Sequence, residues 1–412
     1  SFGRLAAWLK EKGYAFDYLS DKQLEHVVFN EDRLETGGVA YKTIVIPATA
    51  HISLSTWERL LSLAAKGASI IFEHDLPKDV PGWFDLNERR DALQSSQATL
   101  LFESVEDDML KAKLEGGQIL TGSRMEAMLN SAGADPEALV ERGAGYIRRS
   151  HPEGYHYFIS NLSDQVLDDW IPLATPFQSA VIMDPRSSDR SGLAATRQHE
   201  GRPEIYLQLQ PGESCIIRTF LDREAAGTPW TYLQKDGNPL EIQGEWKIEF
   251  IEGGPVLPSA YKTGQLASWT QRGDQEALRF AGTARYTISF DMPDSLMAEY
   301  WQLELGEVRE SASIRLNGKE LGTLWSIPFN LQFDKHLKKG KNLLEIEVTN
   351  LSANRLRDLD MQGADWQKYF FVNIFYKNFD ASRWPLMDSG LLGPVHLQPM
   401  KIKNSLENYE AD

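Results

Sequence analysis

The chain has 412 residues, of which 42% are hydrophobic, and its 43 basic and 59 acidic side chains give a net charge of −16. This composition is typical of a folded protein of about two to four domains. An acidic surface repels phosphate backbones and anionic lipid, so we predict that neither nucleic acid nor a membrane is a partner. The single cysteine, Cys215, excludes an internal disulfide and a cysteine-based metal cluster.

Residues 1–135 alternate helical and strand patterns. Helices are predicted at 4–12, at 21–28 with Ser20 or Asp21 as the N-cap, at 53–64 with Gly67 at the end, and at 123–131. Strands are predicted at 14–19, 41–47 and 68–72. This spacing predicts an open, flavodoxin-like α/β domain. The loops after its strands lack the glycines that a dinucleotide site needs, so we interpret the sheet as structural.

The rest of the chain reads as β structure in two blocks. Residues 136–235 predict a small antiparallel β-sandwich, with strands at 155–160, 179–183, 204–209 and 215–220. Residues 236–403 predict a longer sandwich or jelly roll, with strands at 244–250, 284–290, 301–305, 311–316, 331–333, 342–349 and 393–399. Asn317-Gly318 predicts a type I′ hairpin turn, because both residues tolerate positive φ. The polar tail, 404–412, is expected to be frayed.

Metal-binding patterns are weak. The eight histidines include no H-x-x-x-H pair, and His151 and His156 are expected to face opposite sides of a strand. The acidic runs at 168–169 and 358–360 could supply oxygen ligands for a structural calcium ion, although surface acid pairs are usually only solvated. We expect no other cofactor.

Paired carboxylates could carry out glycoside hydrolysis. Glu304, Glu307, Glu310 and Asp388 are candidates, but 59 acidic residues produce such pairs by chance. The sequence therefore assigns no catalytic residue.

A dense run of aromatic residues lies at 366–384. Sugar sites stack pyranose C–H faces on aromatic rings and add a few planar polar groups. The alternative interpretation is that these rings fill a core or pack on a neighbouring domain. The candidate carbohydrate-binding residues are Arg355, Asp358, Trp366, Tyr369, Asn373, Tyr376, Arg383 and Trp384.

Several of these segments resemble a known family. The runs GYAFDYLSD (13–21), YKTIVIP (41–47) and KGASII (66–71) resemble the region that follows the catalytic barrel in α-L-rhamnosidases of glycoside hydrolase family 106. That region holds an open α/β domain similar to the trimerisation domain of some β-galactosidases. The last block resembles the same family at 282–286, 305–309, 315–325, 348–355 and 389–395. Its run RLNGKELGTLW (315–325) is also similar to the sugar-binding domain of family 2 glycosidases, which implies a galactose-binding-like jelly roll.

The resemblance implies a role for the chain. The catalytic acids of the family lie in the barrel, so none can be transferred to this sequence. We expect a non-catalytic C-terminal accessory region of a secreted bacterial glycoside hydrolase, periplasmic or extracellular, whose partner is a glycan or the enzyme's own barrel. A stand-alone carbohydrate-binding protein and a glycosidase with an unrecognised active site remain as alternatives.

Overall fold

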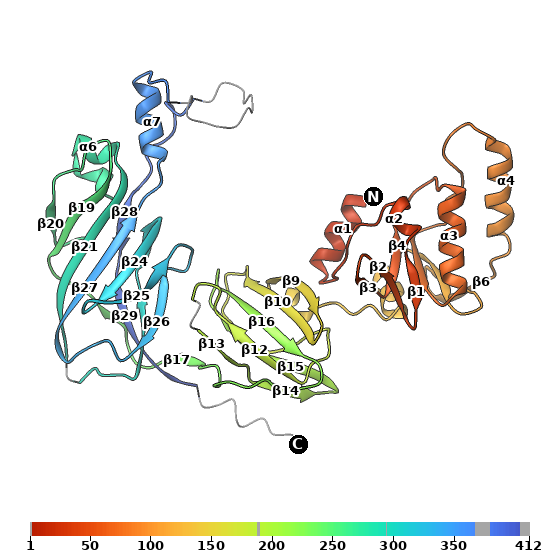
Figure 1. Ribbon diagram of the computed structural model, residues 1–412, viewed down its shortest axis with the longest axis horizontal. Helices are drawn as coiled ribbons and strands as arrows, with labels where there is room; N and C mark the ends of the chain where they lie inside the picture. Colours follow the sequence, from red (N-terminus) through yellow and green to blue (C-terminus); the bar gives the residue numbers. More distant parts are fainter. Residues whose placement is uncertain (1, 188–189, 294, 367–379, 404–412) are drawn as a thin grey trace.

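The computed structural model describes residues 2–187, 190–293, 295–366 and 380–403. The described residues form three units that follow one another along an arc, an α/β unit (residues 2–131), a first β unit (138–220) and a second β unit (233–402) (Figure 1). The chain is rich in β structure, as predicted. Among the described helices, none is long and apolar enough to cross a membrane.

The α/β unit is built on a mixed sheet with the strand order β4-β5-β8-β7-β6. Strands β4, β5 and β8 are parallel, whereas β6 and β7 form an antiparallel hairpin, so the sheet departs from the fully parallel flavodoxin pattern. A small meander, β1-β2-β3, precedes it. The strands are β1 (Val28–Asn30), β2 (Arg33–Thr36), β3 (Val39–Tyr41), β4 (Thr43–Ile46), β5 (Ser69–Glu73), β6 (Phe102–Glu106), β7 (Met109–Lys113) and β8 (Gln118–Gly122).

Helices cover both faces of this sheet, which explains its continuous apolar strands. In β5, Ile70 and Phe72 pack with Trp57 of α3 on one face, and Ile71 packs with Leu9 of α1 on the other. Successive side chains of a strand point to opposite faces, so an apolar triplet is buried only between two helical layers. The helices are α1 (Phe2–Glu11), α2 (Asp21–Leu24), α3 (Leu54–Ala65), α4 (Leu86–Gln97) and α5 (Met125–Ser131).

Two local predictions for this unit were wrong. The predicted strand at 14–19 joins no sheet, because side chains hold it instead: the Tyr14 ring stacks on Trp8 at 6.0 Å, and Tyr41 Oη donates to Asp17 Oδ2 at 2.6 Å. The predicted helix at 21–28 ends after one turn, since the chain then enters β1. Its predicted N-cap, Ser20, is confirmed, with a complete capping box.

The first β unit consists of two facing antiparallel sheets with the orders β13-β12-β16-β10-β9 and β11-β15-β14. Their inner faces share one apolar core that includes Tyr157, Ile182, Ile205 and Ile217. A short 3-10 helix, η1 (Ala138–Arg142), leads into the unit. Its strands are β9 (Ala144–His151), β10 (Gly154–Asn161), β11 (Leu167–Pro172), β12 (Ser179–Met183), β13 (Ser191–Leu193), β14 (Thr196–His199), β15 (Arg202–Leu209) and β16 (Ser214–Phe220).

The prediction that His151 and His156 face opposite sides of a strand was wrong. They lie on two strands joined by a hairpin, in which Gly154 pairs with His151, and their ring centroids are 4.5 Å apart. A turn at 152–153 interrupts the strand alternation on which the prediction relied.

The second β unit is a larger sandwich. One layer has the order β17-β29-β22-β26 and the other β20-β19-β21-β27-β24-β25, and the pair β23-β28 lies beside them. Asn317 and Gly318 have φ values of +53° and +81° between β24 and β25, which confirms the predicted hairpin. The elements are β17 (Leu233–Lys235), β18 (Leu240–Glu241), β19 (Trp246–Gly254), β20 (Tyr261–Thr263), η2 (Trp269–Arg272), α6 (Gln275–Leu278), β21 (Ala281–Met292), β22 (Tyr300–Glu304), β23 (Glu307–Arg309), β24 (Ser311–Leu316), β25 (Lys319–Leu324), β26 (Asn330–Asp334), β27 (Gly340–Thr349), α7 (Ala353–Met361), β28 (Gly390–Gly393) and β29 (His396–Ile402).

A buried carboxylate organises the junction between the α/β unit and the first β unit. Glu137 is 1% exposed; its side chain accepts from Arg148 Nη1 at 2.5 Å, Tyr157 Oη at 2.9 Å and the Ala174 amide at 2.9 Å. Its own amide donates to the Gly13 carbonyl at 2.8 Å, which links it to the segment after α1. The side chain and backbone amide of this one residue thus contact four other segments of the chain.

We expect Glu137→Gln to lower the free energy of unfolding by about 3 kcal/mol, because it leaves the Arg148 cation without its counter-charge. Urea denaturation followed by tryptophan fluorescence measures this change. The matched control is Glu141→Gln at an exposed position of η1, which should change stability by less than about 0.5 kcal/mol. Equal stability of the two variants would contradict the role given to Glu137.

Cys215 lies in the core of the first β unit, where burial raises the pKa of its thiol to about 12. Only the thiolate reacts with iodoacetamide, so at about pH 8 we expect labelling of the native chain to be at least about 100-fold slower than in urea. Mass spectrometry of timed samples measures both rates. Fast labelling of the folded chain would show that the core opens far more readily than its packing indicates.

Candidate functional site

The described part of the predicted sugar site lies around α7, which projects from one end of the second β unit (Figure 1). Arg355 Nη1 and Asp358 Oδ2 form an ion pair of 2.5 Å on one face of the helix. Gln362 Nε2 donates to the other oxygen of Asp358 at 2.8 Å, and Arg279 Nη1 lies 4.0 Å from Oδ2. Both oxygens of Asp358 are therefore engaged by protein donors.

The segments that flank the predicted aromatic run are tied to the same helix. Asp360 accepts hydrogen bonds from Trp366 Nε1 at 2.5 Å and from the Ala381 amide at 2.7 Å. Arg357 Nε donates to the Trp384 carbonyl at 2.9 Å. The structure therefore brings Trp366 and Trp384 to α7, as the prediction of a single site requires.

The burial of Trp366 and Trp384 is relevant to both interpretations of the aromatic run, as a sugar site or as a core. Trp366 is half-buried, and Trp384 is 37% exposed beside the exposed Arg383. Neither tryptophan belongs to the buried core cluster of the sandwich, so the core interpretation does not hold for these two rings. Tyr369, Asn373 and Tyr376 lie outside the described residues, and their part in the site stays a prediction.

The acidic runs proposed for calcium are occupied by protein donors. Asp168 accepts from Tyr206 Oη at 2.6 Å and from Lys403 Nζ at 2.7 Å, whereas Asp169, on the other face of β11, pairs with Arg142 at 3.1 Å. Across the described ranges, no group of three or more histidine, cysteine or acidic side chains is placed to hold a metal ion. The calcium site stays a prediction.

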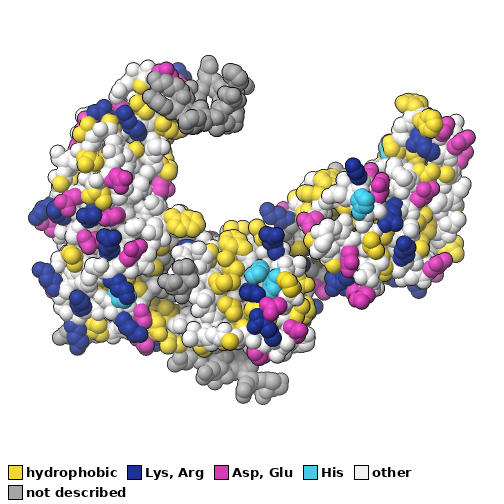
Figure 2. Space-filling model, viewed as in Figure 1, with side chains coloured by type: hydrophobic (Ala, Val, Ile, Leu, Met, Phe, Trp, Pro, Cys, Tyr) yellow, Lys and Arg dark blue, Asp and Glu magenta, His cyan; other side chains and the backbone are white. Residues whose placement is uncertain are grey.

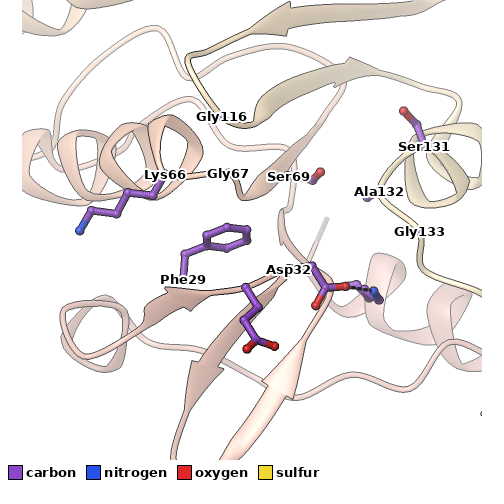
Figure 3. Close-up of a pocket in the computed structure, with 11 residues that line it drawn as sticks. Phe29, Asp32, Lys66, Gly67, Ser69, Gly116, Ser131, Ala132 and Gly133 are labelled. Carbon is purple, nitrogen blue, oxygen red and sulfur yellow. Dashed lines mark hydrogen bonds and ion pairs between the residues drawn. The ribbon is translucent and has the colours of Figure 1, made fainter.

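The α/β unit has a hollow of about 470 Å³ at the amino end of its parallel strands (Figure 3). Lys66 and Gly67 follow α3, Ser69 begins β5, and the end of α5 closes the other side. Ligands of open α/β sheets bind at the carboxyl ends of the strands, and helix C-termini carry partial negative charge that disfavours phosphate. Lys42 Nζ is bound to Asp32 at 2.8 Å. These features disfavour a nucleotide site.

A cleft of about 590 Å³ lies between the two β units. Gln210 and Pro211, in the turn between β15 and β16, line it from the first β unit, and the segment that includes Ile327 lines it from the second. Gly212 follows with φ of +82°, and a Cβ at this position would lie 2.8 Å from the Ile327 carbonyl oxygen. A glycine is therefore required at this close approach of the two units.

The cleft extends over the outer face of the sheet β17-β29-β22-β26, which is polar. Gln302 of β22 lies opposite Gln332 on one neighbouring strand and Gln398 on the other, and Glu304 lies opposite Asn330. Residues directly opposite in an antiparallel pair share a face, so these side chains form two polar rows. Gln302, Asn330 and Gln398 are nevertheless buried.

A chain of hydrogen bonds holds this polar face in place. Arg190 Nη2 of the first β unit donates to Gln332 Oε1 at 2.5 Å. Gln332 Nε2 then donates to Gln302 Oε1 at 3.2 Å, and Gln302 Nε2 donates to Glu304 Oε1 at 2.8 Å. Lys235 Nζ lies 4.0 Å from the same Glu304 oxygen. The amide and carboxylate orientations are thus fixed from one unit to the other.

Two of the candidate carboxylates, Glu304 and Glu307, line this cleft. Each lies beside a cation: Lys235 Nζ is 4.0 Å from Glu304 Oε1, and Arg309 is paired with Glu307. Asp388 instead accepts from Gln271 Nε2 at 3.4 Å. Glu304 and Glu307 are therefore the two candidate carboxylates that this cleft brings together, whereas Asp388 does not line it.

No motif in the sequence predicts this cleft. The alternation of β22 could have indicated a polar outer face, because residues 302 and 304 are polar between apolar neighbours. The opposite wall comes from residues about 90 positions earlier, and no sequence pattern indicates that Gln210 meets β22.

Residues 8–169 match the family model described as alpha-L-rhamnosidase, glycoside hydrolase family 106. The structure of a rhamnosidase from Novosphingobium sp. PP1Y superimposes on 94% of the chain with a TM-score of 0.72 and 22% identity, and it shows the same fold. The resemblance to family 106 is confirmed. The chain spans 36% of that rhamnosidase.

A second relative supports the resemblance to family 2 glycosidases. It is a protein from Formosa agariphila named as a candidate beta-glucuronidase, 31% identical over 191 residues. The matched segment is 40% of this chain and 16% of the relative. The chain therefore corresponds to a minor part of both longer proteins.

Asp360 gives a direct test of the α7 region. We expect Asp360→Ala to lower the free energy of unfolding by about 1–3 kcal/mol, because two charge-assisted hydrogen bonds are lost, and to shift the fluorescence of Trp366 towards that of a solvated indole.

Denaturant unfolding and emission spectra measure both effects. Asp291→Asn, at an exposed position on β21, is the control and should change neither. An unchanged spectrum in Asp360→Ala would show that Trp366 is held by other contacts.

Proposed function

We propose that the chain is a non-catalytic accessory region of an α-L-rhamnosidase-like glycoside hydrolase that acts in glycan degradation. The observation that carries this proposal is the match of residues 8–169 to the α-L-rhamnosidase family, in a chain whose fold follows that of a rhamnosidase over 36% of the latter's length. The resemblance to family 106 implies that catalytic acids belong to a barrel elsewhere in such enzymes.

In this proposal the three units are domains. Residues 1–135 form a domain related to β-galactosidase trimerisation domains, 136–235 a small β-sandwich, and 236–403 a galactose-binding-like jelly roll. The location is periplasmic or extracellular, where glycans are degraded. The second β unit is a sandwich of two sheets, and its strands follow one another along the chain in the order that the sequence predicts. Both features support the jelly-roll assignment.

The partner in this proposal is the catalytic barrel of the same enzyme, with a glycan at its rim. Hydrophobic side chains gather at the tip of the α/β unit (Figure 2). Trp83 and Phe84, which precede α4, are 91% and 82% exposed. Adjacent exposed aromatic side chains are typical of surfaces that pack on another polypeptide, which supports a docking role for this unit.

A second candidate function is a glycosidase whose active site is the cleft between the β units, because Glu304 and Glu307 both line it. The match of residues 8–169 favours the first candidate, because the resemblance to family 106 implies that the catalytic acids belong to a barrel.

The test is hydrolysis of 4-nitrophenyl α-L-rhamnopyranoside by the 412-residue chain. We expect no release of nitrophenol above the buffer rate, since an accessory region lacks the acid and the nucleophile or base that the reaction needs. The Glu304→Gln/Glu307→Gln variant is measured beside it. Turnover by the parent chain that this variant loses would replace the accessory role with the second candidate.

A further inference from the structure

We propose that the cleft between the two β units binds a neutral sugar residue of a glycan chain. This inference takes from the proposed function only the choice of a glycan as ligand. It concerns a site distinct from the aromatic region at α7, and it requires no catalysis.

The first observation is a buried amide without a protein partner. Asn330 lines the cleft and is 8% exposed. Its backbone amide donates to the Pro328 carbonyl at 2.9 Å, but no group in the described part of the chain is hydrogen-bonded to its side chain. The amide atoms of Asn330 are not among the fully buried side-chain atoms that lack a partner, so they face the cleft, where they can bind a ligand that both donates and accepts. A sugar hydroxyl does both.

The second observation is that the neighbouring polar groups are already fixed. The hydrogen-bond chain from Arg190 through Gln332 to Gln302 orients Glu304, which uses Oε1 for its contacts with Gln302 and Lys235. Within the described residues, Glu304 Oε2 has no such contact and is available to accept from a hydroxyl. Groups held in position before binding lose little entropy when a ligand arrives, which favours a small polar ligand.

The third observation is the balance of charge. Four charged residues line the cleft: the cations Lys235 and Arg309 and the anions Glu304 and Glu307. Arg309 is paired with Glu307, and Lys235 lies beside Glu304. Two cations and two anions sum to zero, so neither a phosphate nor a uronate finds an unpaired cation. The cleft is suited to a ligand without net charge.

The last observation is an apolar edge on the same cleft. Ile327 is 68% exposed and adjoins Pro328 and Phe329, and Pro211 lines the cleft from the other unit. Such groups can contact the C–H face of a pyranose while the amides bind its hydroxyls. A volume of about 590 Å³ falls within the range of small-molecule sites and holds one or two sugar residues.

The experiment is calorimetric titration of the whole 412-residue chain with methyl α-L-rhamnopyranoside and, separately, with D-glucuronate. We expect the neutral glycoside to bind with a dissociation constant of about 1 mM and glucuronate to bind at least about tenfold more weakly. Asn330→Ala should weaken binding of the neutral glycoside about five- to tenfold by removing the amide contacts.

Ile327→Ala provides a second variant. Because the Ile327 side chain is exposed, its removal should not unfold the chain, and the lost apolar contact should weaken binding of the neutral glycoside about threefold or more. The matched controls are Asn238→Ala and Ile147→Ala, exposed residues of the same types that do not line the cleft, and both should bind like the parent chain. Thermal melts of all variants show whether each is folded, and Ile327→Ala decides the matter if Asn330→Ala unfolds.

Three results would overturn the inference. The first is that the neutral glycoside does not bind at about 50 mM, far above the expected dissociation constant. The second is that glucuronate binds more tightly than the neutral glycoside. The third is that Asn330→Ala and Ile327→Ala both bind the neutral glycoside as tightly as the parent chain. The rhamnoside hydrolysis assay has an independent outcome, because turnover refutes the accessory role, whereas sugar binding without turnover leaves both proposals in place.

Discussion

The junction of the two β units depends on one constraint, a sheet face that is polar and yet buried. In β22 the alternation of side chains sends Trp301 and Leu303 into the sandwich core and Gln302 and Glu304 to the other face. An outer face of this kind is ordinarily solvated, but here it lies beneath the first β unit. Burying amides is tolerable only when their hydrogen bonds are satisfied, and the chain from Arg190 to Glu304 satisfies most of them.

The other junction follows the same logic with a charge in place of amides. Glu137 is almost fully buried, and a carboxylate in such a place needs both a counter-charge and hydrogen-bond donors. Arg148 supplies the charge, and Tyr157 and the Ala174 amide complete its donors. The carboxylate thus fixes Glu137 within the first β unit, while its backbone amide and Tyr146 Oη both donate to the Gly13 carbonyl of the α/β unit.

Much of the secondary structure could be predicted because local patterns determine it. The helix α3 has a serine N-cap, an apolar stripe and a glycine just beyond its end, and the hairpin at Asn317-Gly318 needs only two residues that tolerate positive φ. The errors arose where non-local contacts decide the structure. Side-chain contacts with Trp8 and Tyr41 hold the extended run after α1 outside any sheet, and the hairpin at 152–153 reverses a chain whose strand pattern looks continuous. The α7 region was indicated by its aromatic residues, whereas the interface cleft requires the pairing of segments that are distant in sequence.

The close approach of Gly212 to Ile327 has a mechanical consequence. The cleft has one wall on each β unit, and its polar floor is linked to the first unit through Arg190. Anything that occupies it makes contacts on both sides of the joint, so the free energy of occupancy also restrains the angle between the units. Binding in the cleft is therefore coupled to the relative orientation of the two β units.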